Sequence, residues 1–168
     1  MSATAVARQS GQAGATSAWL PYAVVFMRVA FGLWLLWHEA IDKWVAWTPK
    51  TLPGIFTSFT KVPGAYPFYV AFLKNVAIPN AGFFAVLVPT WETVFAICLI
   101  LGLGLRVLIP LQIFANINYI LAKTYPSGGA NIDRLTIIIL VTMFLLSAGR
   151  YYGLDGWLRQ RFPRLRWL

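Results

Sequence analysis

Four long apolar stretches dominate the chain, at roughly residues 19–40, 80–103, 107–122 and 132–148. A helix that crosses a bilayer needs about 20 predominantly apolar residues, and each stretch is near that length. The sequence is 59% hydrophobic and 11% charged, whereas charged residues make up about 25% of an ordinary soluble domain. It therefore predicts an all-α, polytopic membrane protein whose four transmembrane helices form one bundle within residues 19–149.

The segments outside these spans differ in composition. Residues 1–18 are small and polar, which predicts a flexible tail and no cleaved signal peptide. Residues 41–79 form the one long external loop, and its prolines and aromatic residues make it too apolar for a solvated loop and too broken for a span. Two short interfacial helices would explain it, with Pro67 to Asn75 as the best candidate for one of them. Residues 150–168 form a basic tail.

The basic residues predict how the chain is oriented. The net charge is +9, and an arginine cluster follows the last span at Arg150, Arg159, Arg161, Arg164 and Arg166. Such a cluster suits the anionic cytoplasmic leaflet better than a nucleic acid. An even number of spans puts both termini on one side. We therefore expect a multi-pass protein of a bacterial or archaeal plasma (inner) membrane with both termini cytoplasmic, and the lipid bilayer rather than nucleic acid as its partner.

Charged and polar residues inside the spans are the candidate functional groups. A charge at mid-membrane costs about 2.5–3.5 kcal/mol on insertion scales. One face of the first span carries, at helical spacing, Arg28, Gly32, Leu35, Glu39 and Asp42. The third span repeats the pattern with Gln112, Asn116, Tyr119 and Lys123. Estimated depths predict a central cluster of Arg28, Glu92, Gln112 and Asn116, and an outer cluster of His38, Glu39, Asp42, Lys123, Asp133 and Arg134.

Each candidate also has a structural interpretation. Arg28 and Glu92 are either functional or an ion pair that fixes helix register, and Gln112, Asn116 and Asn118 could equally be interhelical hydrogen-bond partners. His38 is either an interfacial or cluster residue or a donor to a quinone carbonyl. Because His38 is the one histidine and Cys98 the one cysteine, bis-histidine haem ligation within the chain is impossible and no metal site is expected. No nucleotide or flavin motif is present.

Three motifs carry a resemblance to a known family. They are Arg28-Val-Ala-Phe-Gly32 with Lys43 after the span; Glu92 followed by Leu99-Ile-Leu-Gly102-Leu-Gly-Leu-Arg106; and Ser147-Ala-Gly149-Arg150-Tyr-Tyr-Gly153-Leu-Asp155. With Asn116 and Asn118, their order and spacing resemble the DoxX/DoxD family of small four-helix membrane proteins. That family includes the small-subunit type of thiosulfate:quinone oxidoreductase. The resemblance implies a four-helix membrane fold and a link to quinone chemistry.

Three functional hypotheses follow. The first is an accessory or anchoring subunit of a larger membrane redox complex, with protein partners and no covalently bound cofactor. The second is a quinone-binding oxidoreductase subunit of the thiosulfate:quinone type, with a possible quinone site at Arg28, His38, Glu92, Gln112 and Asn116. The third is a small transporter or proton path, which needs the buried charges alone but lacks the internal repeat typical of transporters. The pattern assigns no catalytic residue and leaves open whether the chain is an enzyme.

Overall fold

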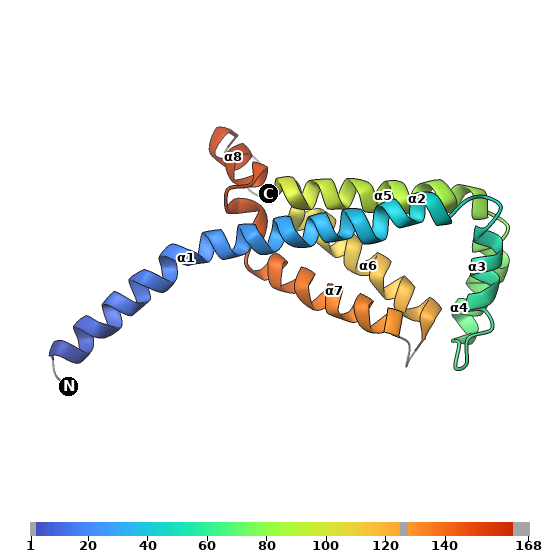
Figure 1. The fold of residues 1–168 in the computed structure, drawn as a ribbon, viewed down its shortest axis with the longest axis horizontal. Helices are drawn as coiled ribbons and strands as arrows, with labels where there is room; N and C mark the ends of the chain where they lie inside the picture. Colours follow the sequence, from blue (N-terminus) through green and yellow to red (C-terminus); the bar gives the residue numbers. More distant parts are fainter. Residues whose placement is uncertain (1–2, 125–127, 163–168) are drawn as a thin grey trace.

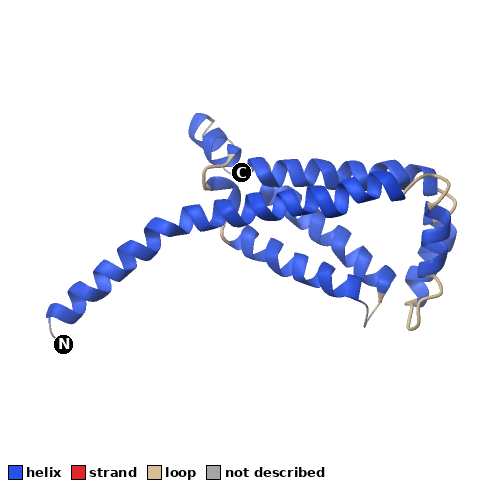
Figure 2. Cartoon of the chain, in the orientation of Figure 1, coloured by secondary structure: helices blue, strands red, loops and turns tan. Residues whose placement is uncertain are grey.

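The computed structural model describes residues 3–124 and 128–162, and every secondary-structure element in these two ranges is a helix (Figure 2). The first apolar stretch forms, in succession, α1 (Ala3–Leu35), the π-helix η1 (Leu36–Ile41) and α2 (Asp42–Ala46). The long loop holds α3 (Leu52–Phe59), α4 (Pro67–Phe72) and the π-helix η2 (Leu73–Ala77). The remaining elements are α5 (Ala81–Leu101), α6 (Leu105–Lys123), α7 (Gly128–Leu145), the short 3-10 helix η3 (Ala148–Arg150) and α8 (Leu154–Arg161).

Within residues 3–124 and 128–162, four helical segments are long and apolar enough to cross a membrane. They are Ala18–Ala46, α5, α6 and α7. Large apolar side chains such as Phe26 and Leu145 point away from the bundle and are 75% exposed, as expected of surfaces that face lipid. The predicted all-α, multi-pass membrane fold with four spans is therefore confirmed, with span boundaries displaced by up to six residues.

The spans are arranged as two pairs. α1 runs beside α5, and α6 runs beside α7. In Figure 1 the two pairs lie close together at the end that carries α8 and diverge toward the end covered by α3 and α4. The bundle therefore has a tight end and an open end, named here the α8 end and the α3/α4 end.

The first helix begins earlier than the composition predicts. Residues 1–18 are expected to lack fixed structure, but α1 is helical from Ala3 and projects beyond the bundle (Figure 1). Alanine has the highest helix propensity, and adding residues to a helix that already exists avoids the cost of nucleation. The first span therefore acts as a helix nucleus, and the alanine-rich segment before it extends the same helix toward the N-terminus.

The π-helix η1 changes which side chains of the first span face the bundle. Arg28 and Leu35 lie on the buried face, as the 3.6-residue spacing predicts. The same spacing places Asp42 on that face, but Asp42 is exposed and Lys43 points inward instead. A π-helical turn inserts one residue into the helical repeat. The insertion moves every later position of the inward face by one, so that an ammonium group replaces the predicted carboxylate.

The long loop forms the short helices that its composition predicts. The segment Pro67 to Asn75 falls within α4 and η2, and α3 is the second short helix. Their apolar side chains turn inward: Leu52, Phe56, Tyr69 and Leu73 are buried in one cluster with Ala77, Ala81, Ala85 and Ala122. The alanines of α5 allow the aromatic rings to approach its backbone. The loop thus covers the α3/α4 end of the bundle.

At the α8 end, two charged side chains tie the helix ends together. The Arg28 guanidinium, 2% exposed, donates to the carbonyls of Ala148 at 2.8 Å and Tyr151 at 3.1 Å. The buried Asp155 carboxylate accepts from the backbone N–H groups of Gly104 at 2.7 Å and Leu105 at 3.1 Å. It therefore caps the first turn of α6, whose N–H groups lack partners within the helix.

Glycines permit this close approach. Gly102 ends α5 with φ +68° in the left-handed region, and a Cβ there would collide with the Arg28 guanidinium. A Cβ on Gly153 would collide with the Gly149 carbonyl and with the same guanidinium. Gly102 and Gly153, which belong to the family motifs, thus leave the space in which Arg28 and the segment after α7 pack against each other.

We expect Gly153→Ala to destabilise the protein by about 1–3 kcal/mol, because the new methyl group overpacks a site bounded by backbone. Gly82→Ala is the matched control, since a Cβ on Gly82 of α5 meets nothing within 4 Å. Thermal unfolding in detergent, followed by circular dichroism, measures both. Equal melting temperatures for the two variants would contradict the packing role of Gly153.

Candidate functional site

The centre of the candidate site is an ion pair between the first and second spans. Lys43 Nζ lies 2.8 Å from both carboxylate oxygens of Glu92 and 2.7 Å from Glu39 Oε2. The Glu92 side chain is 5% exposed and the Lys43 side chain 11% exposed. Glu92 is midway along α5, so Lys43 reaches into the bundle from α2 to neutralise it. Removing either partner would leave a charge in a medium that solvates it poorly.

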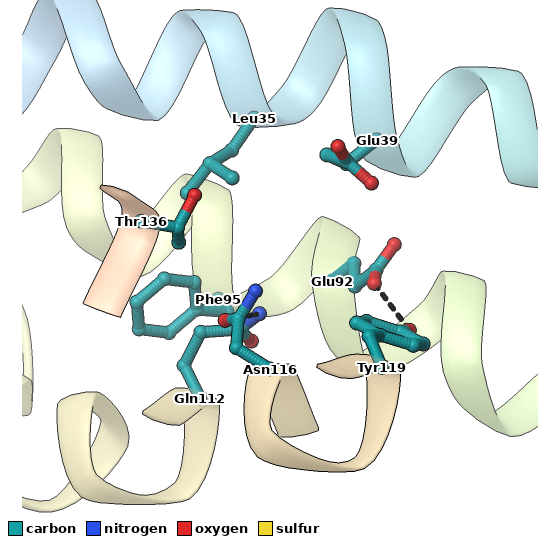
Figure 3. Close-up of a pocket in the computed structure, with 8 residues that line it drawn as sticks. All are labelled: Leu35, Glu39, Glu92, Phe95, Gln112, Asn116, Tyr119 and Thr136. Atoms are coloured by element: carbon teal, nitrogen blue, oxygen red, sulfur yellow. Dashed lines mark hydrogen bonds between the residues drawn. The ribbon is translucent and has the colours of Figure 1, made fainter. Parts of the chain in front are cut away.

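Tyr119 of α6 completes this pair from the opposite side. Its hydroxyl donates to Glu92 Oε1 at 2.6 Å, as Figure 3 shows. Its ring lies between two ammonium groups, with Lys43 Nζ at 4.9 Å and Lys123 Nζ at 5.4 Å from the ring centroid. Both distances are within the range of a cation–π contact. Tyr119 therefore links the Lys43 ion pair to a second ion pair at Lys123.

The second network joins α5, α6 and α7. Lys123 Nζ lies 2.8 Å from Asp133 Oδ2, and Asn116 donates to Asp133 Oδ1 at 3.1 Å. Gln112 donates to Asn116 Oδ1 at 3.2 Å and accepts from the indole N–H of Trp91 at 2.7 Å. The chain of hydrogen bonds thus runs from Lys123 through the middle of α6 to α5.

The two networks together contain unequal charge. Two ammonium groups, those of Lys43 and Lys123, meet three carboxylates, those of Glu39, Glu92 and Asp133. Surplus negative charge is costly in a low-dielectric interior and is relieved by taking up a proton or by contact with water. Glu39 is the carboxylate nearest to solvent, with a side chain 31% exposed. The arrangement therefore provides a place for one exchangeable proton.

A small polar cavity lies among these groups. Its walls include Glu39, Glu92, Gln112, Asn116 and Thr136, gathered around one centre in Figure 3. Its volume is about 10 Å³, which is room for about one water molecule. The polar cavity can thus hold water within the networks but not an organic ligand.

A much larger cavity lies on the other side of Tyr119. It measures about 460 Å³ and lies between the loop helices, α5 and α6. Its walls are almost wholly apolar, with rings contributed by Trp47, Phe56, Phe59, Tyr69, Phe72, Phe84, Trp91, Phe114 and Tyr119. We name it the aromatic cavity. Tyr119 lines both cavities, and Trp91 lines the aromatic cavity while its N–H bonds Gln112 of the polar network.

Tyr69 brings a polar group to the aromatic cavity. It is 8% exposed, and among the described residues its hydroxyl has no hydrogen-bond partner. Burial raises the pKa of Tyr69 to about 12, so the phenol is neutral and able to donate at physiological pH. The hydroxyl itself is not fully buried, so it is accessible to a hydrogen-bond acceptor on a ligand in the cavity.

The structure places the predicted site residues in two groups. Glu92, Gln112 and Asn116 meet, as the sequence predicts, and Glu39, Lys123 and Asp133 join them from the predicted outer cluster. Arg28 does not join this group. It packs against Gly102, which lies ten residues beyond Glu92. Ten residues of helix correspond to a distance of about 15 Å. The predicted place of Arg28 in the central cluster is therefore wrong, and the alternative of an ion pair between Arg28 and Glu92 is not formed.

Three other predicted residues lie outside the networks. His38 is exposed, with its ring tilted against Trp34 at 5.9 Å. Asp42 is exposed on the far side of the π-helical turn. Arg134 donates to the Asn131 side chain at 2.9 Å. Whether any predicted residue binds quinone stays a prediction. No group of histidine, cysteine and acidic side chains in the described ranges could hold a metal ion.

Sequence reasoning missed Lys43, Tyr119 and Trp91 as partners of the candidate residues. Tyr119 carried a usable signal, because it shares a helical face with Gln112 and Asn116. Trp91 precedes Glu92 and resembles any interfacial aromatic residue. Lys43 could not be placed from periodicity, because its inward direction depends on the π-helical turn before it.

We expect Lys43→Met to destabilise the protein by about 3–5 kcal/mol, because it leaves Glu92 buried without its cation. The double variant Lys43→Met/Glu92→Met should lose less unfolding free energy than Lys43→Met and Glu92→Met lose together. Removing both charges also removes the cost of burying them. Lys50→Met, at an exposed lysine of the same end, is the charge-matched control and should change stability by less than about 0.5 kcal/mol. Strictly additive losses in the detergent unfolding cycle would contradict the pairing.

Comparison with known proteins adds no relative to this description. No protein-family model, no curated protein and no solved structure matches the chain. The resemblance to the DoxX/DoxD family stays a prediction carried by the motif residues.

Proposed function

We propose that this chain binds a lipid-soluble quinone in the aromatic cavity and serves as a quinone-linked subunit of a membrane redox assembly. One observation carries the proposal: the aromatic cavity shares Tyr119 with the buried Lys43–Glu92 ion pair. A space suited to a flat apolar molecule thus adjoins a group able to exchange a proton. Quinone chemistry requires both.

The size and lining of the aromatic cavity support a ring-shaped ligand. Ligand cavities typically measure about 300–1,000 Å³ and are mostly apolar with few polar groups, and this one falls in that range. Phe56, Phe84 and Trp91 offer faces and edges on which a quinone ring could stack. The Tyr69 hydroxyl supplies a donor for a quinone carbonyl. The lipid-facing spans on either side give an isoprenoid tail an apolar environment.

The polar networks support an exchange of protons with the ligand. A quinol that is oxidised gives up two protons and two electrons. Tyr119 stands between the aromatic cavity and Glu92, so a proton released at the ligand could pass along its hydroxyl to the carboxylate. The surplus carboxylate of the networks is a suitable acceptor, and Glu39 leads from it toward solvent.

The electrons need a separate carrier. With one histidine and one cysteine, this chain cannot ligate haem through paired histidines. The proposal therefore includes a partner subunit that bears the electron-accepting group, which unites the accessory-subunit hypothesis with quinone binding. No observation favours the transporter hypothesis specifically. A transporter would need a path for its substrate, and the polar cavity has room for about one water molecule.

We expect Ala115→Phe to weaken quinone binding about tenfold or more, because the new ring occupies the aromatic cavity. Tyr69→Phe should weaken it about three- to tenfold through loss of one hydrogen bond. Ala71→Phe, on the exposed side of α4 outside the cavity, is the matched control. The probe is a short-tailed ubiquinone added to the detergent-purified protein, and quenching of tryptophan fluorescence reports binding near Trp47 and Trp91.

Quenching that is equal in all three variants and the wild type would place any bound quinone outside the aromatic cavity and contradict the proposal. Absence of binding by the wild-type chain alone, together with binding by the assembly that co-purifies with it, would assign the site to a partner.

A further inference from the structure

A second possible binding region lies at the α8 end, away from the networks described above. A hollow of about 810 Å³ opens between the Pro21 to Arg28 part of α1, the end of α5 and α8. In Figure 1 α8 lies beside the end of α5, and the Asp155 N–H donates to the Gly102 carbonyl at 2.9 Å. Because the spans end at this level, the hollow lies where lipid headgroups meet the protein.

The surroundings of this hollow are strongly basic. Arg150 lines it and also lines a small neighbouring cavity together with Arg106. The shared wall of that cavity brings the Arg106 and Arg150 side chains together. In agreement with this geometry, burial and the charges of Arg106 and Arg159 lower the pKa of Arg150. Guanidinium groups held together in this way favour a bound anion, above all a phosphate.

The acidic residue nearest to these arginines is already occupied. Asp155 is the one carboxylate of the sequence beyond Asp133, and no acidic residue precedes Glu39. Both oxygens of Asp155 accept from the backbone of Gly104 and Leu105. Its charge therefore stabilises the start of α6 and offsets the arginine charge only in part.

Arg28 forms part of the wall of the hollow. Its terminal nitrogens donate to backbone carbonyls, while its Nε is buried and has no hydrogen-bond partner in the described part of the chain. The guanidinium thus keeps its positive charge beside the hollow with one donor unused.

An apolar groove continues from the hollow along α1. It is lined by Tyr22, Val25, Phe26, Val29, Ala30 and Leu33 and has a volume of about 600 Å³. Tyr152 lines both the groove and the hollow and stacks on Tyr22 with ring centroids 5.8 Å apart. From Tyr22 to Leu33 the helix rises about 16 Å, close to the roughly 15 Å of one leaflet's hydrocarbon.

We propose that the hollow and the groove together bind one anionic phospholipid, with its phosphate beside Arg150 and one acyl chain along α1. Charge selects an anionic headgroup over a zwitterionic one, since the positive charges at Arg28, Arg106, Arg150 and Arg159 exceed the one carboxylate there. The groove selects a lipid over a free anion, because it matches a chain that descends through one leaflet. Exposed Leu154 and Trp157 on α8 anchor this helix at the same interface. The site is separate from the aromatic cavity and does not depend on the proposed quinone function.

The test uses the full chain in nanodiscs that contain equal amounts of phosphatidylglycerol and phosphatidylcholine. Native mass spectrometry after release counts the lipid that stays bound. We expect the wild type to retain phosphatidylglycerol preferentially, and Arg150→Gln/Arg159→Gln to reduce that preference about fivefold for each arginine. The charge-matched control Lys50→Gln/Lys74→Gln, at exposed lysines of the α3/α4 end, should retain it fully. Arg159→Gln alone, at an exposed side chain, should still show the single fivefold loss if the double variant folds poorly.

A second pair of variants tests the groove. Ala30→Trp fills it and should lower retention of phosphatidylglycerol, whereas Ala23→Trp, on an exposed part of α1 outside the groove, should not. Equal retention in the arginine and lysine variants would overturn the proposal. So would protection from thermal unfolding by inorganic phosphate, in lipid-free detergent, equal to that given by phosphatidylglycerol, because the acyl groove would then contribute nothing.

Discussion

The cost of an unpartnered charge in a low-dielectric interior governs the arrangement of this protein. Lys43 meets Glu92 at 2.8 Å, and this contact joins the end of the first span to the middle of α5. Arg28 and Asp155 are also buried, and each satisfies backbone groups of segments distant in sequence. Since no member of either set can be withdrawn without leaving another polar group unsatisfied, the two sets together hold the four spans in one arrangement.

The two ends of the bundle differ because different residues mediate the helix contacts. At the α8 end, Gly102 and Gly153 let backbone, Arg28 and the last turns approach closely. At the α3/α4 end, aromatic rings from the loop helices line one cavity together with rings of α5 and α6. Large rigid rings pack less completely than glycine contacts, and the aromatic cavity forms there. The long loop, which is too apolar to be solvated, thus forms one wall of the aromatic cavity.

Hydropathy and helical periodicity were sufficient to predict the four spans, the loop helices and the meeting of Glu92 with Gln112 and Asn116. Periodicity defines the face on which a residue lies but not its partner on another helix, and for this reason Arg28 was paired with Glu92 instead of with the carbonyls at the α8 end. Lys43 could not be found, because η1 shifts the inward face by one residue. The aromatic cavity depends on how rings from five segments pack, namely Trp47 and the rings of α3, α4, α5 and α6, and no spacing within one segment encodes that packing.

Lysine and arginine are distributed differently between the two ends of the bundle, and the two proposed sites lie at opposite ends. The lysines all lie at or toward the α3/α4 end, where Lys43 and Lys123 act as point charges between carboxylates. Apart from Arg134, the arginines with described side chains lie at or toward the α8 end: Arg28, Arg106, Arg150, Arg159 and Arg161. An ammonium group is compact and strongly hydrated, whereas a planar guanidinium matches the oxygens of a phosphate. Lys43 and Lys123 thus serve internal ion pairs beside the aromatic cavity, and the arginines of the α8 end suit a headgroup layer, in keeping with the predicted placement of both termini at the anionic cytoplasmic leaflet.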